Sequence, residues 1–383
     1  MNGSIENRGK NSWRLMIELG RDANGKRMRK SVTVKGNKSD AQRKLRELLT
    51  NLDKGIPIDE SKKTVGEFLD QWLDTYAKTN TSPKTYYDYS GMIRRYLKPV
   101  IGHIPLKKLN PQMVQQLHAS MYEKGLSART VQYAHKILKH SLKHAVRWEM
   151  LARNVCDLVD SPKGKSKEML ALDINDVQKL LNATSGSTYG HIFHLAVYTG
   201  LRRGELLALR WCDVDLKSKN LSINQSLCTV RGNGVITSNP KTSSSRRQVS
   251  LPPSAAGLLK SIKATRMEQY EAIELEWDES AYIFLRPDGS PMRPDTVTHA
   301  FIRIARELGF ADVRFHDLRH THATLMLKQG VHPKIVSERL GHASVNITMD
   351  TYSHVLPGMQ EEAAVVFEKS LGNIIPEAKA NLF

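Results

Sequence analysis

Cysteine is scarce in this sequence. The 383 residues include three cysteines, Cys156, Cys212 and Cys228, and no two of them stand in C-x-x-C spacing. An odd and sparse set of this kind is typical of buried thiols in a reducing compartment. A zinc site built from these residues is therefore not expected.

Long apolar runs are absent as well. No run is long enough to span a bilayer, and the opening stretch, MNGSIENRGKNSW, lacks the apolar core of a secretory signal. With 40% hydrophobic and 25% charged residues, the composition is that of ordinary globular domains. We therefore expect a cytoplasmic protein without membrane association.

Acidic residues are outnumbered by basic ones. There are 57 Lys and Arg residues against 39 Asp and Glu, so the formal net charge is +18. This excess favours a polyanionic partner, most simply DNA or RNA, over a chain that is basic only for solubility. The length exceeds that of a typical single domain, and two or three domains are expected.

Residues 1–60 predict a small domain of strands and one helix. Apolar and polar residues alternate in SWRLMIELG and again in KRMRKSVTV, with a hairpin turn predicted at DANGK between them. A helix with Ser39 as its N-cap is expected next. The open face of this two- or three-stranded sheet would carry Arg27 and Arg29, either as a solvated polar face or inserted into a DNA major groove.

Residues 64–160 predict an all-helical domain. Thr64 and Glu67 form a capping box, and Asn110 followed by Pro111 begins another helix. No strand is expected between residues 65 and 150. One side of the last helix, SARTVQYAHKILKHSLKHAVRWEM, is basic and either coats the surface or contacts the DNA backbone. Its candidate DNA-contact residues are Lys136, Lys139 and Lys143.

A third, mainly helical domain is expected over residues 167–383. It follows a Lys-, Ser- and Gly-rich joint, DSPKGKSKEML, and contains short strands around NLSINQSL, GVITS and RRQVSLP. The chain as a whole therefore predicts an α+β multidomain protein. Its parts are a small N-terminal sheet with a helix, an all-helical middle, and a mainly helical C-terminal domain with a small sheet.

Four separated segments of residues 167–383 each place a phosphate-seeking group in a tight local context. The segments are TGLRRGELLALRW, NPKTSSSRRQVSLP, HDLRHTHATLM and LGHASVNITMDTYSHV. In chain order they supply Arg202, Lys241, His316, Arg319, His342 and Tyr352. A single H-x-x-R would be weak support for a function, but the full ordered set in these contexts is specific.

This set resembles the tyrosine recombinases, and more narrowly it is similar to the integrases of temperate phages and of integrative conjugative elements from Gram-positive bacteria. The resemblance covers essentially the whole chain. It implies that residues 1–60 are an arm-site DNA-binding domain, residues 64–160 a core-binding domain and residues 167–383 the catalytic domain.

The resemblance also implies the chemistry. Tyr352 would be the nucleophile, forming a 3′-phosphotyrosine bond and releasing a 5′-hydroxyl, with His316 as proton acceptor and Lys241 as proton donor. Arg202 and Arg319 would meet the charge on the nonbridging oxygens. The covalent bond keeps the energy of the broken one, so neither ATP nor an obligatory metal or other cofactor is implied. His342 would add a further hydrogen-bond donor.

Several neighbouring residues allow two interpretations. His316 and His320 stand four apart, a spacing that can hold a metal on a helix, but Arg319 lies on the same face and favours an anion. His320 and His322 match nothing catalytic in the family and are expected to be structural or solvent-facing. Glu205 either orients an arginine or is solvated. Arg246 and Arg247 either contact the DNA backbone or decorate a strand.

The implied partners are double-stranded DNA attachment sites and three further copies of the chain in a homotetramer on DNA. A directionality factor is a further possible partner, and the location would be the nucleoid of a bacterial host. The segment GMQEEAAVVFEKSLG predicts a short amphipathic helix that either caps its own domain or docks on a neighbouring subunit. Two rival functions are a non-catalytic DNA-binding regulator and a metal-dependent nuclease.

Overall fold

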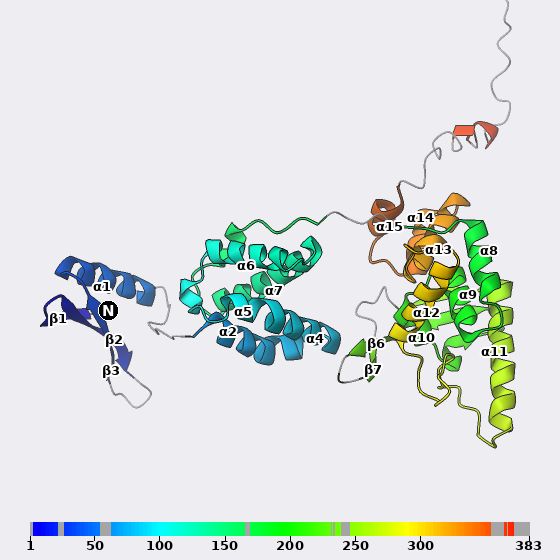
Figure 1. The fold of residues 1–383 in the computed structure, drawn as a ribbon, viewed down its shortest axis with the longest axis horizontal. Helices are drawn as coiled ribbons and strands as arrows, with labels where there is room; N and C mark the ends of the chain where they lie inside the picture. Colours follow the sequence, from blue (N-terminus) through cyan, green and yellow to red (C-terminus); the bar gives the residue numbers. More distant parts are fainter. Residues whose placement is uncertain are drawn as a thin grey trace, which may run out of the picture. The chain divides into compact units, whose positions relative to one another are not determined.

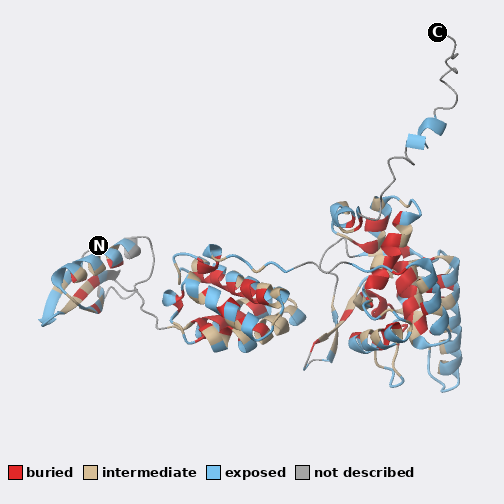
Figure 2. Cartoon of the chain, turned by 45° about the horizontal axis from the view of Figure 1, so that its top comes forward, coloured by how far each residue is buried: buried red, intermediate tan, exposed pale blue. Residues whose placement is uncertain are grey.

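The structure is a computed structural model in which two compact units, Met1–Ser166 and Lys167–Phe383, follow one another along the chain (Figure 1). Buried residues gather between the helices and sheets inside these units (Figure 2). The described residues are 3–21, 27–53, 63–164, 169–230, 232, 234–238, 246–353, 364, 365 and 367–370.

The first strands and helix form a small layer structure. Strands β1 (Gly3–Gly9), β2 (Ser12–Arg21) and β3 (Arg27–Lys35) pair antiparallel in the order β1-β2-β3, and helix α1 (Lys38–Asp53) follows. Leu15 and Ile17 of β2 are fully buried and share a core with Ala41 and Leu48 of α1. The expected sheet and helix are therefore confirmed, with β1 as the third strand.

The predicted N-cap of α1 was wrong. Asn37, not Ser39, caps the helix: its Oδ1 accepts a hydrogen bond from the Asp40 backbone N–H at 2.9 Å. Asp40 Oδ2 in turn accepts from the Asn37 N–H at 3.1 Å. This reciprocal pair satisfies two donors at once, which one serine could not do. The turn expected at DANGK lies outside the described residues.

Residues 65–158 form helices joined by short connections, as expected, with no strand in this fully described stretch. Two of the helices run through a π-helical turn, at Leu73–Ala77 and at Ile93–Leu97. The helices are α2 (Val65–Trp72), α3 (Lys78–Asn80), α4 (Pro83–Met92), α5 (Lys98–Ile101), α6 (Pro111–Glu123) and α7 (Ala128–Arg147), with short 3-10 turns at Leu106–Lys108 and Val155–Leu158.

The caps predicted for this helical stretch are confirmed. Thr64 and Glu67 form the capping box of α2, and the Asn110 side chain accepts from the Met113 N–H with Pro111 as the first residue of α6. Apolar side chains of α2, α6 and α7 meet in one core around Trp72, which is fully buried. The basic residues of α7 lie on its opposite, exposed face.

The second unit is mostly helical with two small antiparallel sheets. Strands β4 (Val214–Asp215), β5 (Asn220–Ile223) and β8 (Arg247–Ser250) form one sheet, and β6 (Ser226–Val230) pairs with β7 (Gly234–Ser238) in the other. The helices are α8 (Ile174–Ala183), α9 (Thr188–Thr199), α10 (Arg203–Leu207), α11 (Pro253–Glu271), α12 (Pro294–Glu307), α13 (Asp317–Lys328), α14 (Pro333–Leu340) and α15 (Val345–Tyr352), with a 3-10 turn at Trp211–Asp213.

Helix α13 is central to the second unit. It packs against α9 and α14, and α14 packs against α15 (Figure 1). Ala323 and Leu327 of α13 share a small core with Val336 and Leu340 of α14 and with Tyr352 of α15. This packing brings the end of α15 against α13, which is the arrangement on which the site described below depends.

The predicted tail helix is described only in part. Ala364, Val365 and residues 367–370 are helical, and the Val365 and Phe367 residues are 48% and 64% exposed. Met359, Ala363 and Val366 lie outside the described residues. In the described ranges, no helix combines the length and the apolar character of a membrane span.

Candidate active site

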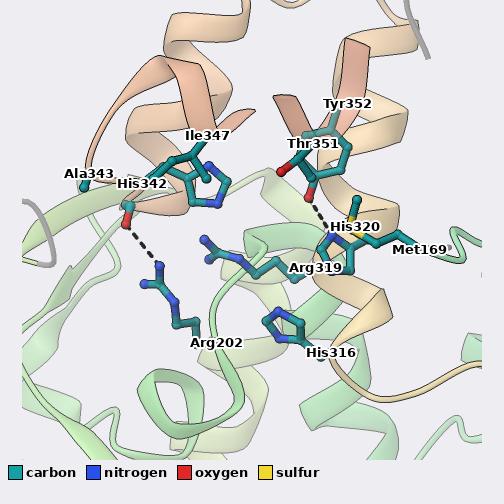
Figure 3. A pocket seen from close by; sticks show the side chains of 11 residues that line it. Met169, Arg202, His316, Arg319, His320, His342, Ala343, Ile347, Thr351 and Tyr352 are labelled. Atoms are coloured by element: carbon teal, nitrogen blue, oxygen red, sulfur yellow. Dashed lines mark hydrogen bonds between the residues drawn. The ribbon is translucent and has the colours of Figure 1, made fainter. Parts of the chain in front are cut away.

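An open cavity of about 380 Å³ lies where α10, α13, α14 and α15 of the second unit meet (Figure 3). It collects side chains from segments that lie more than a hundred residues apart in the sequence. Its lining includes Arg202, His316, Arg319, His320, His342 and Tyr352. Five of the six predicted catalytic residues are therefore brought together in one place.

Arg319 is the buried cation at the floor of this cavity. Only 3% of the residue is exposed, and its two terminal nitrogens donate to the Gly200 and Leu340 carbonyl oxygens, each at 2.8 Å. The end of α9 and the end of α14 are thereby joined through one guanidinium. Burial, with Arg202 nearby, lowers the pKa of Arg319 to about 9, which leaves it protonated at neutral pH.

Arg202 is held at the mouth of the cavity by a shared carboxylate. Its Nη1 donates to Glu205 Oε1 at 2.7 Å, and its Nη2 donates to the Gly341 carbonyl at 3.1 Å. The other Glu205 oxygen accepts from Arg247 Nη2 at 2.9 Å and from the Arg202 backbone N–H at 3.0 Å. One buried carboxylate thus orients two arginines.

The charge of Glu205 is fixed by these arginines. Burial would raise the pKa of its carboxyl, but the hydrogen bonds and charges of Arg247 and Arg202 outweigh that effect and lower it. Arg247 also donates to the Arg339 carbonyl at 2.7 Å, and its side chain is 7% exposed. Of the two interpretations left open for Glu205, orientation of an arginine is therefore the one that the structure has.

His316 and His342 face the cavity as neutral imidazoles. Partial burial, together with His320 and Arg319, lowers the pKa of His316 to about 4, although the residue as a whole is exposed. Burial, Arg319 and Arg202 lower the pKa of His342 likewise to about 4. His342 Nδ1 lies 2.8 Å from Thr348 Oγ1, which orients its ring. At neutral pH both rings are therefore uncharged.

Tyr352 closes the cavity from the end of α15. The residue is 2% exposed, and its hydroxyl oxygen lies 2.7 Å from His320 Nδ1, as the dashed line in Figure 3 shows. Burial raises the pKa of Tyr352 to about 12, and Arg319 offsets part of that rise. The phenol therefore keeps its proton until something in the site takes it.

The arrangement suits a tetrahedral anion. Two guanidinium groups lie beside two neutral imidazoles, so the fixed charge of the cavity is positive, and planar guanidinium donors match phosphate oxygens in pairs. A phenol hydroxyl lies at the edge of the same cavity. Within the described ranges, no three His, Cys, Asp or Glu side chains gather so as to hold a metal ion.

The sequence matches known proteins along most of its length. Residues 171–358 match the phage integrase family, and residues 64–122 match the SAM-like N-terminal domain of phage integrases. A tyrosine recombinase XerC-like protein of Caldanaerobacter subterraneus subsp. tengcongensis is 30% identical over 373 residues, which are 93% of this chain and 95% of that protein. The chain belongs to the phage integrase family of tyrosine recombinases.

Another relative agrees with this membership, and solved structures share the fold. The ICEBs1 integrase of Bacillus subtilis is 28% identical to this recombinase over 287 residues, which are 74% of this chain and 77% of that one. The fold is similar to the Tn1549 transposon integrase in complex with a circular intermediate DNA (TM-score 0.67, 19% identity, 80% of this chain and 99% of that chain). It is also similar to a lambda integrase tetramer bound to a Holliday junction (TM-score 0.58, 18% identity, covering 91% of this chain and 94% of that chain).

The structure places some, but not all, of the candidate residues between β7 and β8 and at the start of β8. Lys241 of the recombinase lies between β7 and β8 in residues 239–245, outside the described residues, so its placement stays a prediction. Arg246 is exposed next to the start of β8. Arg247, one residue later, points inward to Glu205, so neither of the two interpretations given for it was right. The period-two alternation of a strand separates these neighbours.

The DNA-contact candidates of the first unit are surface residues where the structure describes them. Arg29 is exposed and pairs with Glu18 on the neighbouring strand at 3.1 Å, and the Arg27 side chain lies outside the described residues. Lys136, Lys139 and Lys143 are exposed along one face of α7. Lys139 pairs with Asp157 at 2.9 Å, and its side chain is half exposed. Pairs of this kind are weak and can yield to a DNA phosphate.

Two histidines were interpreted too loosely from the sequence of the recombinase. His320 is not solvent-facing, because it lines the cavity and contacts the Tyr352 hydroxyl. His322 is structural: it is 7% exposed, its Nδ1 contacts the Val197 carbonyl at 2.7 Å, and its Nε2 accepts from Arg339 at 3.1 Å. The spacing of four residues between His316 and His320 places both on one face, and this spacing also predicts that His320 reaches the cavity.

Proposed function

We propose that this recombinase integrates and excises a mobile genetic element by cutting DNA strands at attachment sites and rejoining them through Tyr352. The observation that carries this proposal is the convergence of Arg202, His316, Arg319 and His342 on one cavity with a buried tyrosine at its edge. A cavity that is cationic and contains a phenol fits a phosphodiester and a covalent intermediate.

The two arginines act on the phosphate. When the phenol oxygen attacks phosphorus, negative charge builds on the nonbridging oxygens. Arg202 and Arg319, held in advance by Glu205 and by two backbone carbonyls, meet that charge without reorganising. His342 donates a further hydrogen bond. Each such donor lowers the barrier by roughly 3 kcal/mol.

Two proton transfers accompany the exchange of bonds. Tyr352 forms a 3′-phosphotyrosine bond and releases a 5′-hydroxyl, so the phenol loses a proton and the leaving oxygen gains one. His316, a neutral imidazole at pH 7, is a competent acceptor at the cavity, and Lys241 is the proposed donor. The covalent bond conserves the energy of the broken one, so rejoining requires neither ATP nor a metal cofactor.

The remaining parts of the chain bind DNA around this centre. Residues 1–60 are proposed to bind arm sites, residues 64–160 to bind core sites, and residues 167–383 to catalyse. The exposed basic face of α7, with Lys136, Lys139 and Lys143, supports a backbone contact. Arg27, Arg29 and Arg246 are the other proposed contacts.

On DNA the protein is proposed to act as a homotetramer that works with attachment sites in the nucleoid of a bacterial host. The lambda integrase, whose fold is similar, forms a tetramer on a Holliday junction. The exposed Val365 and Phe367 of the tail helix suit docking on a neighbouring subunit. A directionality factor would select excision over integration. The ICEBs1 and phage relatives support a mobile-element role.

The nucleophile is tested with Tyr352→Phe. Full-length protein is incubated with DNA of the host genome and of the element, and covalent complexes are trapped and their DNA sequenced. The recovered site is then used as a nicked duplex. The unmodified protein is expected to form an adduct on this duplex, with or without EDTA, while the Phe variant forms none, because it lacks the attacking oxygen.

The alternatives predict other results. A DNA-binding regulator would form no adduct in either version. A metal-dependent nuclease would release cut DNA without an adduct, lose activity in EDTA and be unaffected by Tyr352→Phe. An adduct that persists in the Phe variant would also overturn the assignment.

A further inference from the structure

His320 contacts the reacting oxygen of the proposed chemistry more closely than any residue assigned so far. The His320 Nδ1 atom lies 2.7 Å from Tyr352 Oη, within the range of a good hydrogen bond. Figure 3 shows the phenol pointing at the imidazole from α15 while the His320 ring rises from α13. Among the described residues, this is the hydrogen bond that the Tyr352 hydroxyl makes.

The direction of this hydrogen bond follows from the two groups. Burial raises the pKa of Tyr352 and lowers that of His320, so the phenol is protonated and the imidazole is neutral at pH 7. A neutral imidazole with its proton on Nε2 offers a lone pair on Nδ1. The phenol can then donate to that lone pair along the path that its proton must take when it attacks.

His316, the acceptor assigned above, stands one helical turn away. The two imidazole rings lie edge to face with centroids 5.1 Å apart. His316 precedes α13, where Figure 3 shows it on the far side of the cavity from the phenol. Among the described residues, His320 and not His316 therefore hydrogen-bonds the Tyr352 hydroxyl.

We propose that His320, in place of His316, is the catalytic residue of this recombinase that orients Tyr352 and accepts its proton during strand cleavage. The inference rests on the function proposed above. A bond forms between Tyr352 Oη and phosphorus as the bond from phosphorus to the 5′ oxygen breaks. The phenol proton moves to His320 Nδ1, and the 5′ oxygen takes a proton from Lys241. On rejoining, His320 returns the proton to the departing phenol oxygen.

The surroundings of His320 make this transfer depend on bound DNA. Burial disfavours the protonated form of the His320 imidazole. The charge of Asp317 favours that form, and the adjacent Arg319 disfavours it. A phosphate seated in the cavity adds negative charge close to both groups, and this charge stabilises an imidazolium. Tyr352 is therefore activated where the scissile phosphate is present, which limits reaction of the free protein.

The test compares two leaving groups on the nicked duplex recovered by trapping. One duplex carries an ordinary phosphate, and the other carries sulfur in place of the bridging 5′ oxygen. Sulfur leaves without being protonated, so it compensates for a missing proton donor but not for a missing proton acceptor. Adduct formation is timed for the full-length protein and for its His320→Ala, His320→Asn and Lys241→Ala variants.

We expect His320→Ala to slow adduct formation by about 10²- to 10³-fold on both duplexes. Lys241→Ala should be slow on the ordinary duplex and recover on the sulfur duplex. His320→Asn places an amide near the position of Nδ1 but cannot accept a proton, and it should stay slow. His299→Ala, an exposed histidine of α12, is the control and should react at the rate of the unmodified protein.

Three results would overturn the inference: His320→Ala reacting at full rate or faster, its rescue by sulfur, or full activity of His320→Asn. The last would leave His320 a positioning residue only. If His320→Ala does not fold, His320→Asn decides. Failure of the unmodified protein to form an adduct, or an adduct with Tyr352→Phe, would instead overturn the proposed function, so the two failures are distinguishable.

Discussion

At the scale of single residues, the site is organised by one acidic side chain among many basic ones. Glu205 accepts hydrogen bonds from Arg202 and Arg247, and it is 6% exposed. Without that carboxylate, two guanidinium groups would face each other with no counter-charge between them. In a chain with a net charge of +18, these two arginines therefore depend on a buried carboxylate.

Glu205→Gln tests this dependence. The amide keeps the size of the side chain but removes the charge, leaving Arg247 buried without its carboxylate. We expect a loss of about 3 kcal/mol in the free energy of unfolding and a clear fall in the rate of adduct formation. Urea unfolding and the nicked-duplex assay measure the two effects.

Glu279→Gln is the matched control. Glu279 pairs with Lys263 at 2.7 Å, but its side chain is 53% exposed, and pairs in such positions contribute at most about 1 kcal/mol. If both variants lost the same free energy of unfolding and the same adduct-formation rate, the buried carboxylate would have no special part in the site.

At the scale of secondary-structure elements, the site depends on two helix ends that meet at Arg319. Gly200 caps the C-terminus of α9 and Gly341 caps that of α14, both in the left-handed conformation, with φ of 65° and 68°. These turns leave the carbonyls of Gly200 and Leu340 free to accept from Arg319. Glycine adopts this conformation without the strain that a Cβ atom causes.

Gly200→Ala should disrupt this junction. A Cβ atom there would lie 2.5 Å from the His322 ring and 2.8 Å from Leu340, in addition to the strain of its positive φ. We expect a loss of about 3 kcal/mol in stability, the sum of about 1 kcal/mol of backbone strain and about 2 kcal/mol of crowding. Thermal unfolding and adduct formation should both be impaired.

Gly309→Ala separates the two contributions. Gly309 also has a positive φ, of 88°, but among the described residues beyond its chain neighbours no atom lies within 4 Å of the Cβ position. Its substitution should cost only the backbone strain, about 1 kcal/mol. If both variants lose the same stability, the contacts of Gly200 do not matter.

At the scale of the whole molecule, each unit contains a histidine buried in neutral form. In the first unit, burial and His118 lower the pKa of His135 to about 4. The His135 Nδ1 and His118 Nε2 atoms lie 3.2 Å apart. In the second unit, burial and Arg339 lower the pKa of His322 to about 4. An unfolded chain has no such burial, so its histidines bind protons near their ordinary pKa of 6.5.

Acid should therefore begin to destabilise the protein at pH values above those at which carboxylates titrate. The folded-state pKa lies below the unfolded one, so the stabilisation is complete above about pH 6.5 and is lost as the pH falls towards 4. Between pH 7 and pH 5 each such histidine should remove about 2 kcal/mol. Thermal unfolding at the two pH values measures this loss.

His322→Asn should flatten the pH dependence of the second unit, because asparagine can keep the donor to the Val197 carbonyl but does not titrate. His103→Asn, at an exposed position, serves as the comparison and should leave the pH dependence unchanged. If stability changed with pH to the same extent in both variants, this account would be contradicted.

Much of the fold could be predicted from local sequence patterns. The capping box of Thr64 and Glu67 and the cap at Asn110 depend on residues three positions apart, and both are confirmed. The N-cap of α1 was missed because two candidate caps, Asn37 and Ser39, compete within three residues. The helices of residues 65–158 follow from periodic apolar residues, which need no knowledge of their partners.

The sequence by itself determined the family, the kinds of helix and strand segments along the chain, and five of the residues that gather at the cavity, because each of these is written in short motifs. Only the tertiary structure decided what those residues touch. The bond from His320 to Tyr352 and the pairing of Arg247 with Glu205 join positions 32 and 42 residues apart. Such contacts arise from how helices and strands pack, and no local spacing encodes them.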